Sequence, residues 1–390
     1  MATQVQSLRF FFVFTLVFLL ASCASQQSPV ASIDSDQKQQ LLAGLPQWQL
    51  ETILPSNKDL LRLTPEMERF ARQYIPNERS KWGVDKLNKA LAHSSMLDVD
   101  YVPDKTYSAE DTFFYREGNC LSYAYLFTAM AREKGFRVRF QQVELPPVWS
   151  GEGKALVMQK HINVVVNLPG ERYVVEFDEA RSRNDALNNE SYPARIIGDD
   201  VALAEFYNNH GVEALLREEY GKAFQYFRGA LEVTEEVGHL WVNLGVLYSH
   251  TKQPHLAQWA FEQALTVEPR NSSAMVNLAR VYKAQGDVQS AEKLQAKAMA
   301  ERHKNPYYLY ALAQHAYKTG DYHKAEAQVL EAIAKREDHH FYYLLGLTFW
   351  QQEKMHHASE AFIRAKALSR THKDRERYGE KISALTVAGR

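Results

Sequence analysis

The segment REGNCLSYAYLF, Arg116 to Phe127, places a cysteine directly after an asparagine and at the start of an apolar run. Asn119 is a good N-cap residue, and helical apolar spacing continues from it to Gly135, which suits a helix C-terminus. Unpaired N–H groups at a helix N-terminus stabilise a thiolate and lower the thiol pKa. Cys120 is therefore a candidate nucleophile. The alternative is a small core residue, since free cysteine is among the most buried residue types.

A thiolate nucleophile needs a general acid, usually histidine, and a group that orients that histidine. Three segments after the predicted helix have alternating patterns that predict β-strands: 136–145, 161–168 and 172–180. The polar turn between the last two predicts an antiparallel hairpin. Its open end would bring His161 and Asp178 together, with about 5 Å between their Cβ atoms. Glu176 and Glu179 are rival partners for the histidine, and Glu176 lies on the same face as Asp178.

The motif GNCLSYA, Gly118 to Ala124, resembles the Gly-x-Cys-x-x-aromatic-Ala signature of the transglutaminase-like superfamily, a papain-related fold. The resemblance implies an α+β domain in which the cysteine opens a helix packed against an antiparallel sheet. Gly118, Tyr123 and Ala124 fill structural places in this motif. The resemblance covers residues 90–190 well and the helices upstream only loosely.

The same resemblance assigns chemical roles, with Cys120 as nucleophile, His161 as acid/base and Asp178 as its orienter. It implies acyl transfer through a thioester, with a peptide or a glutamine side chain as substrate and backbone N–H groups at the helix start in the oxyanion hole. Peptidase, deamidase and cross-linking activities stay open, but hydrolysis is favoured because it needs no second substrate site. Two residues are candidate substrate contacts: Asn163, where many members have an aromatic residue, and Trp149, in the loop predicted between the first two strands.

The other cysteine belongs to the N-terminus. The apolar run over 10–20 is too short for a membrane-spanning helix and, with a charge before it and small residues after it, predicts a signal peptide over 1–22. LASC, which ends at Cys23, resembles the lipobox of bacterial lipoproteins and implies a lipidated Cys23; an ordinary signal peptide is the alternative. Ala24 then favours the outer membrane, facing the periplasm. Residues 23–40 are expected to form a flexible tether.

The C-terminal half contains an internal repeat of 34 residues, with the last step one shorter. The recurring alanines are Ala223, Ala257, Ala291, Ala325 and Ala358. The copy that contains WVNLGVLY and closes with Pro269 resembles the tetratricopeptide repeat. This resemblance implies an all-α solenoid of five repeats over 201–372, with a concave surface for a protein partner. The charged segment 373–390 is expected to be a capping helix.

The remaining features place these parts in one chain. Helical spacing of apolar residues predicts helices over 41–75 and 82–97, with breaks at Pro55, Pro65 and Pro76, so the transglutaminase-like domain is expected over 41–200. With 46 basic and 47 acidic residues, the charge gives no support to a nucleic-acid partner. No metal or nucleotide motif is found, so no cofactor is expected. The sequence favours a membrane-anchored thiol enzyme whose repeats recruit a protein substrate. The alternative is a non-catalytic scaffold that binds polypeptide through its repeats and through a transglutaminase-like domain that has lost its activity.

Overall fold

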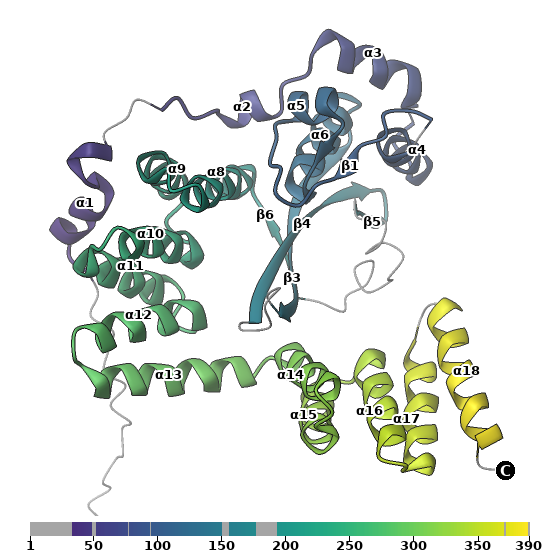
Figure 1. The fold of residues 1–390 in the computed structure, drawn as a ribbon. Coiled ribbons are helices and arrows are strands. Elements are labelled where there is room, and N and C mark those ends of the chain that lie inside the picture. The colour runs from purple at the N-terminus through teal and green to yellow at the C-terminus, as the bar shows by residue number, and fades with distance from the viewer. Residues whose placement is uncertain are drawn as a thin grey trace, which may run out of the picture.

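The computed structural model describes these residues: 33–48, 52–76, 78–93, 95–149, 156–176, 193–369 and 372–388. Three predicted features lie outside them, namely the signal peptide, Cys23 and Asp178. The described residues form an α+β unit followed by an all-helical solenoid (Figure 1), so the predicted fold class is confirmed. Among the described helices, none combines the length and the apolar character that crossing a bilayer requires.

The α+β unit packs helices on a four-stranded antiparallel sheet with the strand order β5-β4-β3-β6. Its strands are β3 (Arg137–Trp149), β4 (Leu156–Leu168), β5 (Glu171–Val175) and β6 (Ala194–Ile197). Its helices are α3 (Pro65–Tyr74), α4 (Lys81–Ala92), α5 (Ala109–Tyr115) and α6 (Cys120–Glu133), and a short parallel bridge joins β1 (Asp100–Tyr101) to β2 (Glu117–Gly118). Every residue of α6 from Leu121 to Ala131 is buried, so α6 is the central helix of the unit.

The loop predicted between the first two strands, 146–160, is mostly strand. β3 continues to Trp149 and β4 begins at Leu156, and the pairing register shifts between Leu145 and Val148. Two prolines lie at this shift, and proline within a sheet is tolerated at a bulge because the ladder is already interrupted there. The prediction that Trp149 lies in a loop is therefore wrong, since its backbone pairs with Leu156.

The solenoid consists of five antiparallel helix pairs and a final helix. The pairs are α8 (Asp199–Leu216) and α9 (Tyr220–Val233), α10 (Gly238–His250) and α11 (Pro254–Val267), α12 (Ser272–Ala284) and α13 (Val288–His303), α14 (Pro306–Lys318) and α15 (Tyr322–Lys335), and α16 (His339–Gln351) and α17 (Met355–Leu368). The recurring alanines lie on the second helix of each pair and are buried. Glycines on first helices pack against the phenylalanine four residues after that alanine: a Cβ on Gly245 would lie 2.5 Å from Phe261. The same close contact recurs between Gly211 and Phe227 and between Gly346 and Phe362, in the first and last repeats. The final helix, α18 (His372–Ala388), packs on α17.

The described chain begins with elements that differ from those expected. They are α1 (Ser35–Ala43), the 3-10 helix η1 (Pro46–Trp48) and α2 (Asn57–Leu60). Residues 35–40 belong to the predicted tether but form most of α1, because Asp34 and Gln37 make a reciprocal capping box that starts the helix. The helical segment predicted over 41–75 with breaks at Pro55 and Pro65 has one further break, because α1 ends at Gly44 and η1, α2 and α3 follow as separate elements.

Residues 35–48, here called the N-terminal strap, dock on the outer helices of the first two repeats. Leu41 is fully buried, and its carbonyl accepts a hydrogen bond from the Tyr248 hydroxyl. The Trp48 ring lies 5.4 Å from that of Phe224 and 5.7 Å from that of Tyr248, measured between centroids. The strap therefore belongs to the solenoid core. The sequence does not predict this docking, because the strap and the repeats that it contacts lie far apart in the chain.

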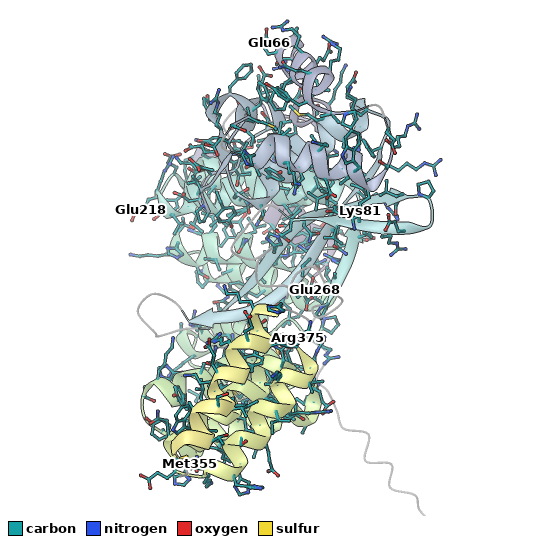
Figure 2. All side chains as sticks on the ribbon, turned by 90° about the vertical axis from the view of Figure 1, so that its right-hand side faces the viewer. Glu66, Lys81, Glu218, Glu268, Met355 and Arg375 are labelled. Atoms are coloured by element: carbon teal, nitrogen blue, oxygen red, sulfur yellow. The ribbon has the colours of Figure 1, made fainter. Side chains whose placement is uncertain are left out.

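One hydrophobic core runs from the strap through the α+β unit to α13. Helix α8 joins the two parts: its Phe206 contacts Tyr125 of α6 at 6.1 Å between centroids, and Asp199 accepts two hydrogen bonds from Arg132 of α6. The helices from α14 onward have two smaller cores of their own. Figure 2 shows Glu66 of the α+β unit and Met355 of the last repeat at opposite ends of the molecule.

Replacing Trp48 with alanine is expected to lower the free energy of unfolding by about 3 kcal/mol, because burial of the indole is lost and a cavity is left beside two aromatic rings. Urea denaturation followed by circular dichroism measures this change. Trp82→Ala is the matched control, since Trp82 is 53% exposed and its loss should cost less than about 0.5 kcal/mol. Equal costs for the two variants would contradict the docking of the strap.

Candidate active site

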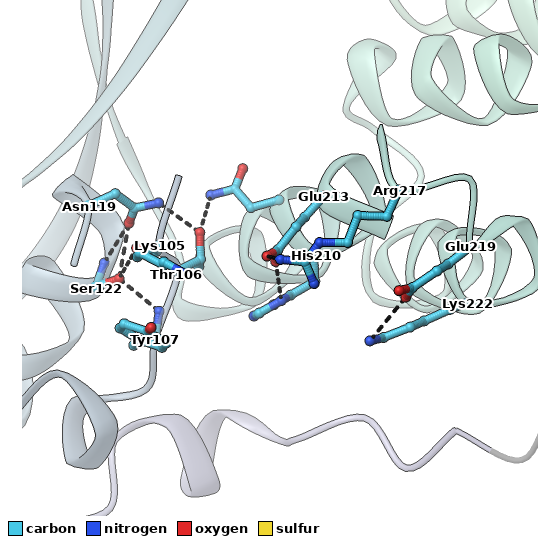
Figure 3. Close-up of polar contacts among 11 residues, drawn as sticks. Lys105, Thr106, Tyr107, Asn119, Ser122, His210, Glu213, Arg217, Glu219 and Lys222 are labelled. Atoms are coloured by element: carbon cyan, nitrogen blue, oxygen red, sulfur yellow. Dashed lines mark hydrogen bonds and ion pairs between the residues drawn. The ribbon is translucent and has the colours of Figure 1, made fainter. Parts of the chain in front are cut away.

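The start of α6 is held by the residue before the cysteine. Asn119 is the N-cap, as predicted, and its side-chain oxygen accepts hydrogen bonds from the N–H groups of Leu121 (3.1 Å) and Ser122 (3.0 Å). The Asn119 amide also donates to Thr106 Oγ1 at 2.7 Å (Figure 3). Cys120 is therefore the first residue of a helix whose N-terminus is fixed by a buried polar network.

The other residues of the motif support the same turn. A Cβ on Gly118 would lie 2.6 Å from Ser122 Cβ, which explains why the motif needs glycine there. Ser122 Oγ accepts from the Tyr107 N–H at 2.8 Å and donates to the Lys105 carbonyl at 3.0 Å (Figure 3). Tyr123, one residue further along α6, is 2% exposed. The glycine and the aromatic residue thus have packing roles beside the thiol.

The predicted hairpin that carries the histidine is present. β4 pairs with β5 in the register Val164↔Val175 to Leu168↔Glu171, around a tight turn in which Gly170 has a φ of 81°. This positive φ suits glycine, which has no Cβ to clash. The hairpin brings His161 and the residue after β5 to its open end.

Among the described residues, Glu176 supplies a carboxylate to His161. His161 Nε2 donates to Glu176 Oε1 at 2.6 Å, and the two side chains are only 1% and 3% exposed. Asp178, the predicted orienter, lies outside the described residues. Among the described residues β4 pairs with β5 from Val164↔Val175 to Leu168↔Glu171, and the same register continued would place Asp178 directly across from His161. The longer glutamate side chain reaches the histidine from the diagonal position.

Asn163 has a different position from the one expected. It is 3% exposed, and its amide donates to Glu176 Oε2 at 3.3 Å, so it holds the carboxylate instead of lining the space around the thiol. The two oxygens of Glu176 are thereby shared between His161 and Asn163. A sequence signal for this role exists, because residues two apart on a strand point to the same face. Trp149, the other candidate substrate contact, lies at the end of β3, and the position of its side chain is not described.

The electrostatics of the thiol and the imidazole are coupled. Burial raises the pKa of Cys120, but the charge of His161, its hydrogen bond to the sulfur and a backbone hydrogen bond from Ile162 together hold that pKa below its ordinary value. Burial lowers the pKa of His161, whereas the neighbouring Cys120 thiolate and Glu176 raise it by more. The arrangement therefore favours a thiolate beside an imidazolium, which is the reactive form of a cysteine nucleophile.

Cys120 is partly exposed and lines a cavity of about 580 Å³ between the α+β unit and the first three repeats. The described residues also contain one group of possible metal ligands, Asp338, His339 and His340 at the start of α16. Asp338 caps that helix and accepts from His340, while His339 pairs with Tyr378 of α18. These bonds tie α16 to α18, so we assign the group a structural role.

Iodoacetamide alkylation of Cys120 is expected to rise with pH at a midpoint below the ordinary thiol value of about 8.5. In His161→Gln the midpoint should move above that value, because the charge that lowers the pKa is lost while burial, which raises it, stays. Peptide mass spectrometry across a pH series measures both profiles and distinguishes this cysteine from Cys23. The same midpoint in both proteins would contradict the coupling.

The family comparisons agree with the geometry. Residues 72–175 match the transglutaminase-like superfamily, and residues 252–314 and 310–370 match two tetratricopeptide-repeat families. A curated relative is the tetratricopeptide repeat domain-containing protein PYG7, chloroplastic, of Arabidopsis thaliana, at 31% identity over 99 residues, which are 24% of this chain and 33% of the relative. The chain thus spans about a third of that protein.

Three solved structures are similar to the chain. MamA has 16% identity and a TM-score of 0.24, and the match covers 45% of this chain and 94% of MamA. YrrB, a TPR protein with an unusual peptide-binding site, has 17% identity and a TM-score of 0.25, over 45% of this chain and 92% of YrrB. Pseudomonas aeruginosa pilF has 16% identity and a TM-score of 0.25, over 47% of this chain and 91% of pilF. Because these TM-scores are low, the assignment depends on the family matches. The chain carries a transglutaminase-like domain followed by tetratricopeptide repeats.

Proposed function

We propose that the protein is a lipid-anchored thiol enzyme that hydrolyses a peptide bond or a glutamine side-chain amide. The observation that carries this proposal is the series of contacts from Cys120 through His161 to Glu176, at the N-terminus of a buried helix and beside an open cavity. A nucleophile, an acid/base and an orienting carboxylate are what acyl transfer through a thioester needs. The tetratricopeptide repeats support a protein as the partner or substrate.

In this mechanism the thiolate attacks the carbonyl carbon and the amide nitrogen leaves with a proton from His161. Glu176 binds Nε2 of the imidazole, which leaves Nδ1 as the nitrogen available to the sulfur and to the leaving amine. Water then attacks the thioester carbonyl carbon while His161 takes a proton from the water. The carboxylic acid product leaves, and the Cys120 thiolate and the His161 imidazolium are regenerated.

The helix start offers a donor for the oxyanion. The N–H groups of Leu121 and Ser122 bind the Asn119 side chain, and that of Tyr123 binds the Asn119 carbonyl. The Cys120 N–H therefore is the first-turn donor left to stabilise the developing negative charge, and the fixed helix start orients it before the reaction begins.

A second candidate function is a non-catalytic scaffold that binds polypeptide through the repeats. The observation that favours it is that repeat residues supply much of the cavity wall beside the thiol. The two functions differ in one respect that can be tested: only the enzyme needs a reactive thiol and its buried partners.

Substrate turnover separates these functions. With a library of glutamine-containing peptides, the full chain is expected to release ammonia or new N-termini, measured by mass spectrometry. Cys120→Ala should lower the rate by about a thousandfold or more, since the nucleophile is lost. Glu176→Gln should also lower it strongly, because the hydrogen bond that orients His161 is weakened. Glu171→Gln, at an exposed position of β5, is the matched control and should not. No turnover, together with an ordinary alkylation profile, would favour the scaffold.

We further propose that Cys23 anchors the chain to the envelope membrane. The LASC motif supports this, and helix α1 begins at Ser35, only 12 residues after Cys23. A fully extended segment of that length spans at most about 40 Å, so the anchor would keep the strap and the outer helices of the first repeats close to the lipid surface.

The membrane anchor is tested by replacing Cys23 with serine, which removes the acceptor thiol. In a bacterial host supplied with radiolabelled palmitate, the natural chain should take up label and sediment with membranes, whereas Cys23→Ser should lose the label. Cys120→Ser is the matched control and should keep it. Label in Cys23→Ser would show that the anchor lies elsewhere.

A further inference from the structure

The loop that joins β1 to α5, residues 102–108, is here called the cap loop, because it lies against the start of α6. Two of its residues bond with Ser122 Oγ. The Lys105 carbonyl also accepts from the Asn119 N–H at 2.8 Å, and Thr106 Oγ1 accepts from the Asn119 side chain at 2.7 Å. The cap loop and the N-cap of α6 are therefore one connected structure.

Thr106 sets the orientation of the Asn119 amide. The oxygen of that amide must face the N–H groups of Leu121 and Ser122 to cap α6, and its nitrogen then faces Thr106 Oγ1. Thr106 and Asn119 are each only 6% exposed, so the loss of their bond would leave a buried donor unsatisfied. The position of the Thr106 hydroxyl thus fixes the cap, and the cap fixes the first residue of α6, Cys120.

A second contact with Thr106 comes from the repeats. The side-chain amide of Asn209, on α8, donates to the same Oγ1 at 3.2 Å. His210, the next residue of α8, lies beside the Thr106 backbone. Its ring packs against those of Phe206 and Tyr226, at 4.5 and 5.2 Å between centroids. Figure 3 shows Thr106 between the start of α6 and His210, so the first repeat holds the cap loop from the other side.

Helix α8 can hold the cap loop because its own position is fixed on α6. Arg132 of α6 donates to Asp199 at the start of α8, and Tyr125 of α6 contacts Phe206. Asn209 follows Phe206 by three residues, so it lies within one turn of this contact. The bond from Asn209 to the cap loop is therefore made from a fixed base.

We infer that Asn209, although it belongs to the first repeat, is a positioning residue for Cys120. Its bond to Thr106 holds the Asn119 cap, and the cap holds the thiol beside His161. The inference concerns the state of the thiol and does not depend on hydrolysis of an amide. The unit that supports the reactive cysteine thus includes the first helix of the solenoid.

The test is Asn209→Ala in the full chain. Asn209 is half-buried and lines both the cavity at Cys120 and a second cavity of about 360 Å³, so its truncation should leave the fold intact. A looser cap lets the thiol move away from the charge of His161. The alkylation midpoint of Cys120 should therefore rise by at least about half a pH unit, which is about a threefold loss of thiolate below the midpoint. Peptide mass spectrometry across a pH series measures it.

The matched control is Asn243→Ala. Asn243 occupies the corresponding place one repeat later, on α10, and its amide donates to Asn208 Oδ1 of α8 at 2.6 Å. Its truncation removes an amide hydrogen bond from α8 while the bond from Asn209 to Thr106 stays. Both variants should keep the natural circular dichroism spectrum, but Asn243→Ala should also keep the natural alkylation midpoint.

A second pair of variants tests the same contact from the cap loop. Thr106→Val removes the acceptor of both amides and should raise the midpoint at least as far as Asn209→Ala does. Thr106→Ser keeps the hydroxyl and should restore the natural midpoint. A natural pH profile in Asn209→Ala, even with a lower resistance to urea, would show a role in folding alone and overturn the inference, as would an equal shift in Asn243→Ala.

The outcomes also separate this inference from the proposed function. If the natural chain hydrolyses no amide but Asn209→Ala raises the alkylation midpoint, the inference holds and the enzymatic proposal fails. If Asn209→Ala hydrolyses amides at the natural rate and keeps the natural midpoint, the enzymatic proposal holds and the inference is contradicted.

Discussion

The buried hydrogen bond between His161 and Glu176 is the interaction on which the rest of the site depends. An imidazolium that is 1% exposed would be very costly without a partner, and the carboxylate supplies one at 2.6 Å. That pair requires the register of the β4–β5 hairpin and the support of Asn163. It also sets the state of Cys120, because a charged histidine is what lowers the thiol pKa against the effect of burial.

Features with a short-range cause could be predicted from the sequence. The start of α6 followed from Asn119 beside Cys120, and the hairpin followed from two alternating segments around a polar turn. The solenoid followed from a period of 34 residues, since each repeat makes the same contacts with its neighbour.

Features with a long-range cause could not be predicted from the sequence. The strap forms because Trp48 finds a place between aromatic rings of the first two repeats, which lie far away in the sequence. Strand β6 has only four residues and exists because it pairs with the middle of β3. The contact between Glu176 and His161 depends on the placement of both side chains at the open end of the hairpin, and no local pattern in the sequence gives that placement. The sequence offered Glu176 and Glu179 as alternative partners of His161, but it did not show which side chain is close enough to contact the imidazole.

The division of the hydrophobic core has a mechanical consequence. The main core joins the α+β unit to the first three repeats, and separate small cores hold α14 to α18. Motions occur most readily where few apolar contacts must be broken. We therefore expect the molecule to bend inside the solenoid, between α13 and α14, and not at the boundary between the transglutaminase-like domain and the repeats. Bending there would change the contact between α14 and β3, while the cavity wall beside Cys120 stays rigid.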